Sequence, residues 1–346
     1  MAESFTLNIL GSASARPNIY RNPSAQVLQV RGHLFLIDCG EGTQKAFLKQ
    51  KRILREWIDK HPDTNGVMNI SFQALDAICL SHIHGDHIFG IFGLLSTMGL
   101  EGRRDPVHIY APSNFAPILK FFLSYYGEGL KYELVFHPLK MKAPEVVYEN
   151  SSMELVSFPL KHGIDAYGFL FREKTPGLNV NKESVSRYGL TLKEIALLKS
   201  GNDVVREPGP DEEPSIENGF TRFSGSDEPM IISCADNTYL PFKPRSYAYC
   251  SDTTPFPALA SWVEGIDVLY HEATYSAINS AKAHERGHST NIDAAKCASD
   301  AHVGKLLVGH YSASLTDEFL ATTYHDELVE AFPNSVMVHD GDIFEI

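Results

Sequence analysis

The chain has 346 residues, of which 43% are hydrophobic, so it has enough apolar side chain for a sizeable core and is not a disordered chain. Its net charge of −13 argues against non-specific nucleic-acid binding over the whole surface, but a local basic patch remains compatible with it. No run is long and apolar enough to span a membrane, there is no secretion signal, and five scattered cysteines lack a CxxC pair; we expect a cytoplasmic protein with reduced thiols.

Strand and helix patterns alternate along the chain. Apolar runs typical of strands lie at 5–10, 25–30, 33–38, 74–80, 107–112, 153–160, 267–273 and 304–310. Arg31 and Gly32 predict a turn between the second and third of these runs. Helical spacing is found at 42–61, 114–126 and 291–303, and Thr290 with Asp293 predicts a capping box before the last of these helices.

One region departs from this alternation. Residues 201–229 are rich in Gly, Pro and acids and have neither a helical nor a strand period, which predicts a long exposed loop. The segment before it, 181–201, is helical in character. It carries the basic residues Lys182, Arg187, Lys193 and Lys199. We interpret the two segments together as an arm inserted into the domain.

The segment SHIHGDH, residues 81–87, is the strongest chemical signal. His82 and His84 are two residues apart, so they point the same way if the chain is extended. Gly85 permits a turn that brings Asp86 and His87 into the same space. One pair could hold one divalent ion and the other pair a second, but neither fills a zinc coordination shell alone. A metal site here needs further ligands from elsewhere in the chain.

Candidates for those ligands share a position just past the end of an apolar run. They are His162, Asp252, His271, Glu272 and His310. Because α/β proteins gather their sites at one edge of a sheet, this repeated placement predicts a common site. Taken one at a time, each of these residues could equally serve as a capping or surface group.

SHIHGDH after a strand resembles the metal loop of the metallo-β-lactamase superfamily, and within it the chain resembles ribonuclease Z, the endonuclease that trims the 3′ trailer of precursor tRNA. The similarity runs nearly end to end, through LGSASARPNIYRNPSAQVL, FLIDCGEGTQ, SHIHGDHIFGIFGLLST, LKHGIDAYGFLF, YCSDT, HEATY, GHST and VGHYSAS. It implies an α/β (α+β) fold, a four-layer αβ/βα sandwich. This would be a single domain over 1–346 with an exosite-like arm inserted at 172–245.

The resemblance also assigns metal ligands. One zinc ion would be held by His82, His84 and His162. The second would be held by Asp86, His87 and His310, with Asp252 bridging the two ions. Two Zn²⁺ per subunit, or Mn²⁺ or another divalent ion in their place, would lower the pKa of a bridging water and clamp the phosphate.

Further roles follow from the same resemblance. Asp86 could orient the attacking water as a base. Glu272 and His288 would form a proton-donating pair for the departing 3′ oxygen. Asp38, at a strand end, would fix a metal-binding histidine from behind, although an Asp before Gly40 could also simply form a turn.

Substrate contacts are expected on two segments. Ser12, Ser14, Arg21 and Asn22 resemble the family's substrate-side loop and suit phosphate contacts, with an ordinary hairpin turn as the alternative. Lys193 and Lys199 belong to the arm. A stripe of Lys45, Lys49, Arg52 and Arg55 could meet the tRNA backbone, or could be the solvated face of an amphipathic helix.

The sequence departs from the family in its substrate-gripping parts. The arm lacks the usual Gly-Pro signature, Ser314 and Leu315 replace an arginine and an aromatic residue, and residues 57–71 form an extra stretch. An arginine lost near phosphates removes a bidentate contact.

These observations lead to one functional hypothesis and two alternatives. The hypothesis is a zinc-dependent endoribonuclease that removes the 3′ trailer of precursor tRNA and leaves a tRNA 3′-hydroxyl and a 5′-phosphate on the trailer. By resemblance it would be a homodimer in which one subunit's arm grips the tRNA cut by the other. The alternatives are a small-molecule phosphodiesterase of the same superfamily and a binding protein that has lost its metals.

Overall fold

The protein is described by a computed structural model that covers residues 4–16, 19–62, 66–207, 216–217, 220–221 and 229–346. The chain divides into two compact units. The larger unit comprises Glu3–Lys174 and Arg245–Ile346, and the smaller comprises Thr175–Pro244 with Met1–Ala2. The smaller unit covers most of the segment 172–245, and the role of that segment as an exosite-like arm stays a prediction.

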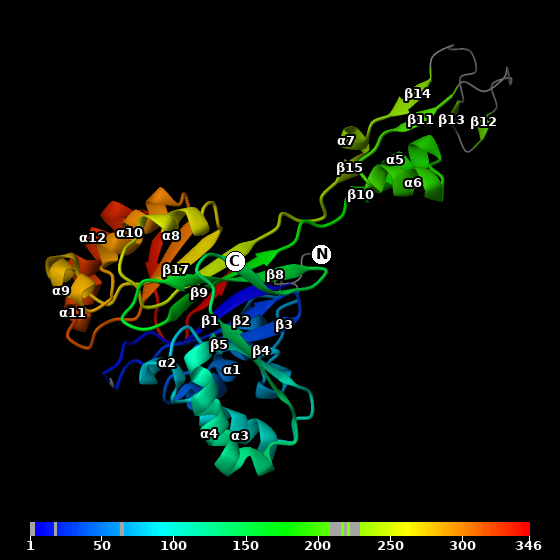
Figure 1. Cartoon of the computed structure of the whole chain (residues 1–346). Helices are drawn as coiled ribbons and strands as arrows, with labels where there is room; N and C mark the ends of the chain where they lie inside the picture. Colours follow the sequence, from blue (N-terminus) through cyan, green and yellow to red (C-terminus); the bar gives the residue numbers. More distant parts are fainter. Residues whose placement is uncertain (1–3, 17–18, 63–65, 208–215, 218–219, 222–228) are drawn as a thin grey trace. The chain divides into compact units, whose positions relative to one another are not determined.

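Two seven-stranded sheets form the larger unit within its described residues (Figure 1). The first has the order β20-β1-β2-β3-β4-β5-β6. Its strands are β1 (Phe5–Gly11), β2 (Ala25–Val30), β3 (His33–Ile37), β4 (Ala77–Cys79), β5 (Val107–Pro112), β6 (Leu134–Leu139) and β20 (Ile343–Glu345). The second has the order β19-β18-β17-β16-β9-β8-β7. Its strands are β7 (Glu145–Glu149), β8 (Met153–Leu160), β9 (Ala166–Glu173), β16 (Ser246–Cys250), β17 (Val268–Glu272), β18 (Lys305–Gly309) and β19 (Ser335–Met337).

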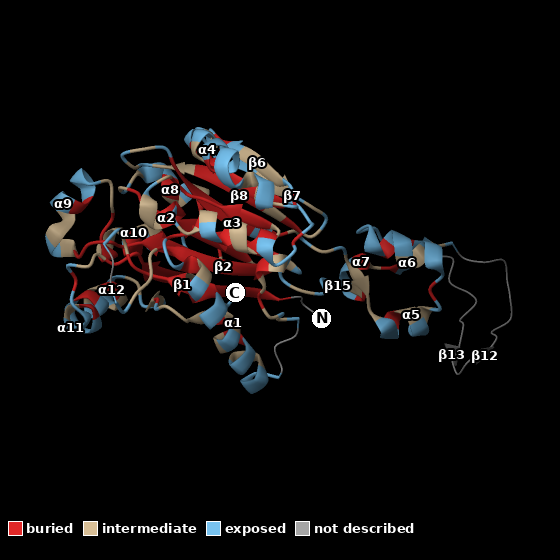
Figure 2. Cartoon of the chain, turned by 90° about the horizontal axis from the view of Figure 1, so that it is seen from below, coloured by how far each residue is buried: buried red, intermediate tan, exposed pale blue. Residues whose placement is uncertain are grey.

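Helices cover the outer face of each sheet. The first sheet packs against α1 (Thr43–Lys60), α3 (Ile91–Leu100) and α4 (Ala116–Tyr126), and the second against α8 (Pro257–Trp262), α10 (Asn291–Asp300) and α12 (His325–Ala331). A third cluster, which includes Leu7, Phe35, Phe169 and Tyr247, joins residues of both sheets and lies between them. In Figure 2 the central strands of the larger unit are buried and the helices expose their outer faces. The predicted four-layer αβ/βα sandwich is therefore confirmed.

Local signals in the sequence account for several element boundaries. Arg31 and Gly32 have φ angles of 52° and 80°, and they form the predicted turn between β2 and β3. The capping box before α10 is present, with the Thr290 side chain accepting from the Asp293 backbone and the Asp293 side chain from that of Thr290. This capping box satisfies backbone N–H groups that the start of a helix leaves without an intrahelical partner.

The smaller unit is built from short elements around its own small core. The elements are β10 (Asn179–Val180), α5 (Lys182–Tyr188), α6 (Leu192–Lys199), β11 (Val204–Arg206), β12 (Ile216–Glu217), β13 (Phe220–Thr221), β14 (Met230–Ile232), α7 (Cys234–Asn237) and β15 (Thr238–Tyr239). Gly189, with φ of 54°, ends α5, and Thr191 caps α6 through a capping box with Glu194. Leu190, Leu198 and Ile232 are buried in the core.

The prediction of a loop without strands over 201–229 is wrong in part. Val204–Arg206 forms β11, which pairs antiparallel with β14, and Val204 is buried in the small core. A three-residue strand is too short to show a period, and its partner begins 24 residues later in the chain. Local sequence therefore carries no signal for the pair. Residues 208–215, 218–219 and 222–228 of the same segment lie outside the described residues.

An ion pair in the smaller unit predicts a pH effect on α6. Arg206 donates to both carboxylate oxygens of Glu194, and its hydrogen bonds hold the pKa of Glu194 at about 2, below the usual 4.5. A lowered folded-state pKa means that the stabilisation is present above pH 4.5 and is lost as the pH falls towards 2. Hydrogen-exchange protection of α6 should be higher in wild type than in Glu194→Gln at pH 6. This difference should shrink between pH 4.5 and 2; a constant difference would contradict the assignment.

The larger unit contains a fully buried carboxylate that is paired with two arginines. Glu173, at the end of β9, is fully buried and pairs with Arg31 and Arg245, whose nitrogens lie 2.7 Å from its Oε1. We expect Glu173→Gln to lower the free energy of unfolding by about 3 kcal/mol in urea titrations, because two largely buried arginines lose their counter-charge. The surface pair of Glu149 and Lys174 offers the matched control, and Glu149→Gln should change little. Equal losses of stability in the two variants would show that the buried pairs of Glu173 contribute no more than the surface pair does.

Two global expectations can be compared with the described residues. No helix among them combines the length and apolar character needed to cross a membrane. The five cysteines, all of which are described, are free thiols, and four of them are buried.

Candidate metal centre

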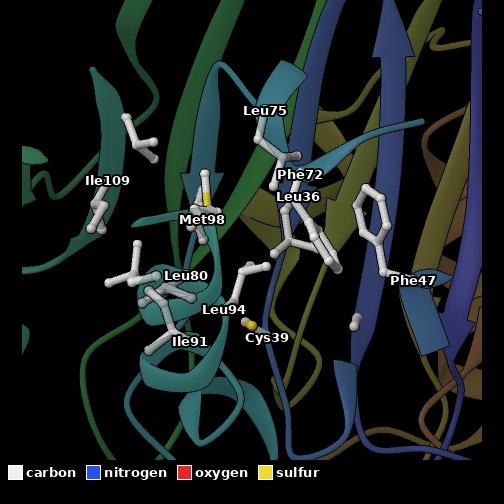
Figure 3. Packing of buried hydrophobic residues seen from close by; sticks show 14 of the residues in the cluster. Leu36, Cys39, Phe47, Phe72, Leu75, Leu80, Ile91, Leu94, Met98 and Ile109 are labelled. Carbon is white, nitrogen blue, oxygen red and sulfur yellow. The ribbon is translucent and has the colours of Figure 1, made fainter. Parts of the chain in front are cut away.

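The SHIHGDH loop leaves the end of β4 and is anchored by the apolar core beneath it. Leu80 and Ile91, on either side of the loop, are fully buried together with Cys39 in the layer between the first sheet and its helices (Figure 3). Gly85–Ile88 forms the short helix α2, which turns Asp86 and His87 towards the histidines before it. The loop therefore has a fixed support on both sides.

Residues distant in sequence complete three overlapping groups of potential ligands among the described residues. The first contains His82, His84, His162 and Asp252, and the second contains Asp86, His87 and His310; these two hold all the residues expected to bind metal, and we call them the two ligand groups. The third combines His288 with Asp252 and His310. Within each group, the ligand atoms all lie within 4.8 Å of one another. The structure thus brings together the seven residues that the sequence nominated as metal ligands.

Asp252, which follows β16, lies between the two groups. Its Oδ2 is 3.6 Å from Nε2 of His82 and 3.8 Å from Nε2 of His162. Its Oδ1 is 3.6 Å from Nε2 of His87 and 3.4 Å from Nε2 of His310. Each carboxylate oxygen therefore faces one group, which is the arrangement that a bridging ligand requires.

Hydrogen bonds from behind fix the ring tautomers of three histidines. His87 Nδ1 donates to Asp38, and His162 Nδ1 donates to the carbonyl of Gly287, both at 2.8 Å. The Thr274 hydroxyl donates its proton to Glu272, so its oxygen can only accept a further hydrogen bond. His310 Nδ1, which lies 2.8 Å from that oxygen, is therefore the donor. Whenever one of these rings is neutral, the lone pair of its Nε2 points into the cluster.

This arrangement fits bound cations. Nε2 of His87 and Nε2 of His310 face each other at 3.2 Å, so either a shared proton or a cation must lie near both nitrogens. Within the described part of the chain, the buried Oδ1 of Asp252 has no hydrogen-bond partner. Burial, together with the neighbouring imidazoles, lowers the pKa of His82 well below its usual value, so this ring is neutral and can offer a nitrogen lone pair to a cation. Imidazole and carboxylate donors suit zinc and similar divalent ions.

Asp38 organises the cluster from the end of β3. It is fully buried, has a left-handed backbone φ of 55°, and accepts from His87, from the hydroxyl of Tyr249 at 2.7 Å, and from both the backbone and the hydroxyl of Ser81. Bonds to Ser81 and His87 tie this carboxylate to both ends of the loop. The geometry therefore favours the supporting role over a simple turn.

Glu272 and His288 form a pair beside the cluster. Glu272 Oε1 accepts from the backbone of Thr253 and of Ser289 and lies 3.1 Å from His288 Nδ1, while Oε2 accepts from Thr274. Burial alone would lower the pKa of His288, but Glu272 outweighs it and raises that pKa to about 9. Against a burial effect that would raise it, His288 holds the pKa of Glu272 below its usual value. Each member of the pair therefore favours the charged form of the other, and the contact with Glu272 is made through Nδ1 of His288.

The sequence did not indicate some of these supporting groups. Thr274 joins Glu272 to His310, and Tyr249 reaches Asp38 from the other sheet. Gly287 has φ of 78°, and a Cβ there would lie 2.6 Å from His162 Nδ1, so the close approach requires glycine. Thr274 lies within HEATY and Gly287 is the first residue of GHST, so membership of a motif was the available signal. His271, by contrast, is buried, and its Nδ1 bonds the carbonyl of Glu272.

The expected substrate-side loop is held by Asp340. Asp340 accepts from the backbone and hydroxyl of Ser12 and from the backbone of Asn22. Ser12 is buried, so its hydroxyl serves the loop itself. Arg21 bonds Asp317 and lies over the ring of Tyr311, next to His310.

The remaining predicted substrate contacts are placed as follows. Ser14 is half-buried, and its backbone bonds the carbonyl of Tyr311. Lys193 and Lys199 are exposed on α6 of the smaller unit. Leu315 is buried in the core behind the second sheet, which explains an apolar residue there, and Ser314 is exposed.

The sequence is similar to known proteins over almost its whole length. Ribonuclease Z of Bacteroides fragilis is 35% identical over 339 residues, covering 98% of both chains. Ribonuclease Z of Porphyromonas gingivalis is 34% identical over 313 residues, covering 90% of both. A family model described as "Anti-Pycsar protein Apyc1" matches residues 5–178.

Solved structures agree in fold. The short form of human tRNase Z has a TM-score of 0.63 at 20% identity and covers 98% of both chains. The metallo-β-lactamase fold protein YhfI of Bacillus subtilis has a TM-score of 0.61 at 15% identity, covering 99% of this chain and 100% of that one. At these identities the likeness concerns the fold alone. Together with the relatives above, it shows that the chain belongs to the ribonuclease Z family of metallo-β-lactamase-fold hydrolases.

Proposed function

We propose that this hydrolase is a zinc-dependent endoribonuclease that removes the 3′ trailer from precursor tRNA. The products would be a tRNA with a 3′-hydroxyl and a trailer with a 5′-phosphate. The observation that carries the proposal is the Glu272–His288 pair at 3.1 Å, set beside two ligand groups that Asp252 faces with one carboxylate oxygen each. A ribose oxygen leaves poorly without a proton, and this pair offers a donor for it.

Each residue of the site would have its own role in the hydrolysis. Two divalent ions, when bound by the two ligand groups, would make water nucleophilic at neutral pH and offset the charge of the phosphate. Asp86, beside His87 and His310, would orient the attacking water and accept its proton. Glu272 would hold His288 with Nε2 towards the leaving oxygen. Asp38 would keep the His87 ring in place.

Metal content gives a direct check on these roles. We expect about two ions per chain by elemental analysis, with zinc as the main metal, since imidazole donors dominate the two groups. Removing the ions with a chelator should abolish hydrolysis and lower the melting temperature, because ions that bind only the folded state stabilise it. A metal-free protein that keeps its activity would contradict the assignment.

Substrate grip would come from basic groups outside the metal centre. Lys45, Lys49, Arg52 and Arg55 are all exposed on α1, as are Lys193 and Lys199 on α6 of the arm. We propose that the arm, Thr175–Pro244, acts as an exosite for the tRNA backbone, with two chains paired so that each arm serves the partner's site. Such contacts depend on salt, so tRNA affinity should fall as salt rises.

The deciding experiment is cleavage of a precursor tRNA that carries a 3′ trailer, with both product ends mapped. One cut at the tRNA 3′ end, leaving a hydroxyl on the tRNA, is the expected result. No cut, with hydrolysis of a simple phosphodiester retained, would overturn the proposal.

A second candidate is hydrolysis of a small-molecule phosphodiester at the same centre. Two observations favour it: the match of residues 5–178, half the chain, to the "Anti-Pycsar protein Apyc1" model, and the segment YGLTLKEIALLKSG, which stands in the arm where the family carries its Gly-Pro signature. Full-length similarity to ribonuclease Z favours the first candidate. The same assay separates the two, because the second predicts turnover of small diesters without trailer removal.

A further inference from the structure

An open pocket of about 440 Å³ lies between the start of α1 and the junction of α2 with α3. Lys45 and Leu48 from α1 line it, together with Phe89 and Gly93 from the other side. We propose, on the basis of the function above, that this pocket holds the nucleobase next to the phosphate bound at the metal centre. Its volume is in the range of small-ligand sites.

The first argument is the position of Phe89. This residue follows the ligand His87 by two positions, so their Cα atoms lie within about 8 Å of each other. Its ring packs on the metal loop, because a Cβ added at Gly85 would lie 2.3 Å from it. Even so, 66% of Phe89 is exposed. An exposed aromatic ring beside a phosphate site is a stacking platform for a base of any identity.

The second argument is the glycine on the floor of the pocket. A Cβ at Gly90 would lie 2.1 Å from the carbonyl oxygen of Gly40, and one at Gly99 would lie 3.0 Å from that of Gly129, so packing explains both. A Cβ at Gly93 would meet only the Gln44 side chain, at 3.3 Å. Glycine weakens a helix, and neither packing nor a left-handed backbone requires it here. Keeping the pocket open for a ligand does explain it.

Charge provides the third argument. Lys45 is exposed in the first turn of α1, which contains no acidic residue. A cation at one wall suits the phosphate backbone on either side of the base, while Leu48 and Phe89 suit the base itself. The same wall adjoins the expected substrate loop, since Gly42, which caps the start of α1, also lines the pocket and a Cβ there would lie 4.0 Å from Asn22 Oδ1. The chemistry of the lining therefore matches one nucleotide of a phosphodiester substrate.

The test compares the full-length, metal-loaded wild type with Phe89→Ala and Gly93→Ala. Binding of AMP and of inorganic phosphate is measured by calorimetry, alongside kcat/KM for precursor tRNA. We expect Phe89→Ala to weaken AMP binding about tenfold and to lower kcat/KM for precursor tRNA by a similar factor, because a stacked base is lost. Phosphate, which has no base, should bind wild type and variant alike. Gly93→Ala should weaken AMP binding while raising the melting temperature by about 2 °C.

Tyr125→Ala provides the matched control, since Tyr125 is an aromatic residue on α4 that is 70% exposed. The proposal that the pocket holds a nucleobase would be overturned if Phe89→Ala bound AMP as tightly as wild type does. It would also be overturned if wild type bound AMP no more tightly than phosphate. If wild type does not cut precursor tRNA while AMP binding still depends on Phe89, then the tRNA function fails and the pocket stands. If trailer removal is intact in wild type and in both variants, then the tRNA function stands and the pocket proposal fails.

Discussion

Asp252→Asn is expected to lower kcat for any phosphodiester by at least about a thousandfold, or about 4 kcal/mol of transition-state stabilisation. Asp252 is the residue whose two oxygens face the two ligand groups separately, Oδ2 towards His82 and His162 and Oδ1 towards His87 and His310. An amide keeps the shape but loses the negative charge and one of the two acceptor oxygens. Metal content should fall from about two ions per chain to one or fewer.

Hydrolysis of bis(p-nitrophenyl) phosphate and elemental analysis provide the two measurements for Asp252→Asn. Asp300→Asn offers a matched control, since Asp300 is an exposed acid at the end of α10 that pairs only with Lys296 among the described residues. A variant that keeps both ions and full activity would show that the two ligand groups do not share Asp252. Loss of activity with unchanged metal content would instead point to a role in orienting the substrate.

His288→Ala is expected to lower kcat for precursor tRNA by about a thousandfold, within the usual range for a positioned general acid. The loss should depend on the leaving group. A ribose oxygen needs a proton as it departs, whereas nitrophenolate leaves without one. The same variant should therefore lose no more than about tenfold on bis(p-nitrophenyl) phosphate. Glu272→Gln should follow the same pattern, with an added loss of stability because its amide would face the backbone donors of Thr253 and Ser289.

The comparison of the two substrates is the measurement for the His288 prediction. His325→Ala controls for the loss of a histidine, since His325 is exposed at the start of α12. Equal losses on both substrates would mean that His288 organises the metal centre and is not a proton donor. No loss on either substrate would remove the Glu272–His288 pair from the mechanism.

From the sequence by itself we could predict the class of fold and a set of candidate ligands, which the resemblance to ribonuclease Z assigned to two ions. Apolar runs of strand length alternate with helical spacing, and ligand-type side chains follow the ends of those runs, as His162, Asp252 and His310 do. Both signals are local, because burial on one face sets a period and a strand end needs only its own residues. The turn at Arg31–Gly32 and the capping box of Thr290 were predictable for the same reason.

Only the tertiary structure decided how those residues support one another. Tyr249 bonds Asp38 from 211 positions away, and Asp340 holds Ser12 from 328 positions away. β11 pairs with a strand whose sequence gives no hint of the match. The division of Asp252 between two ligand groups, and the pocket beside Phe89, likewise depend on segments that meet only after folding. A sequence pattern reports which face of an element is buried, but the partner on that face is chosen by packing of the whole chain.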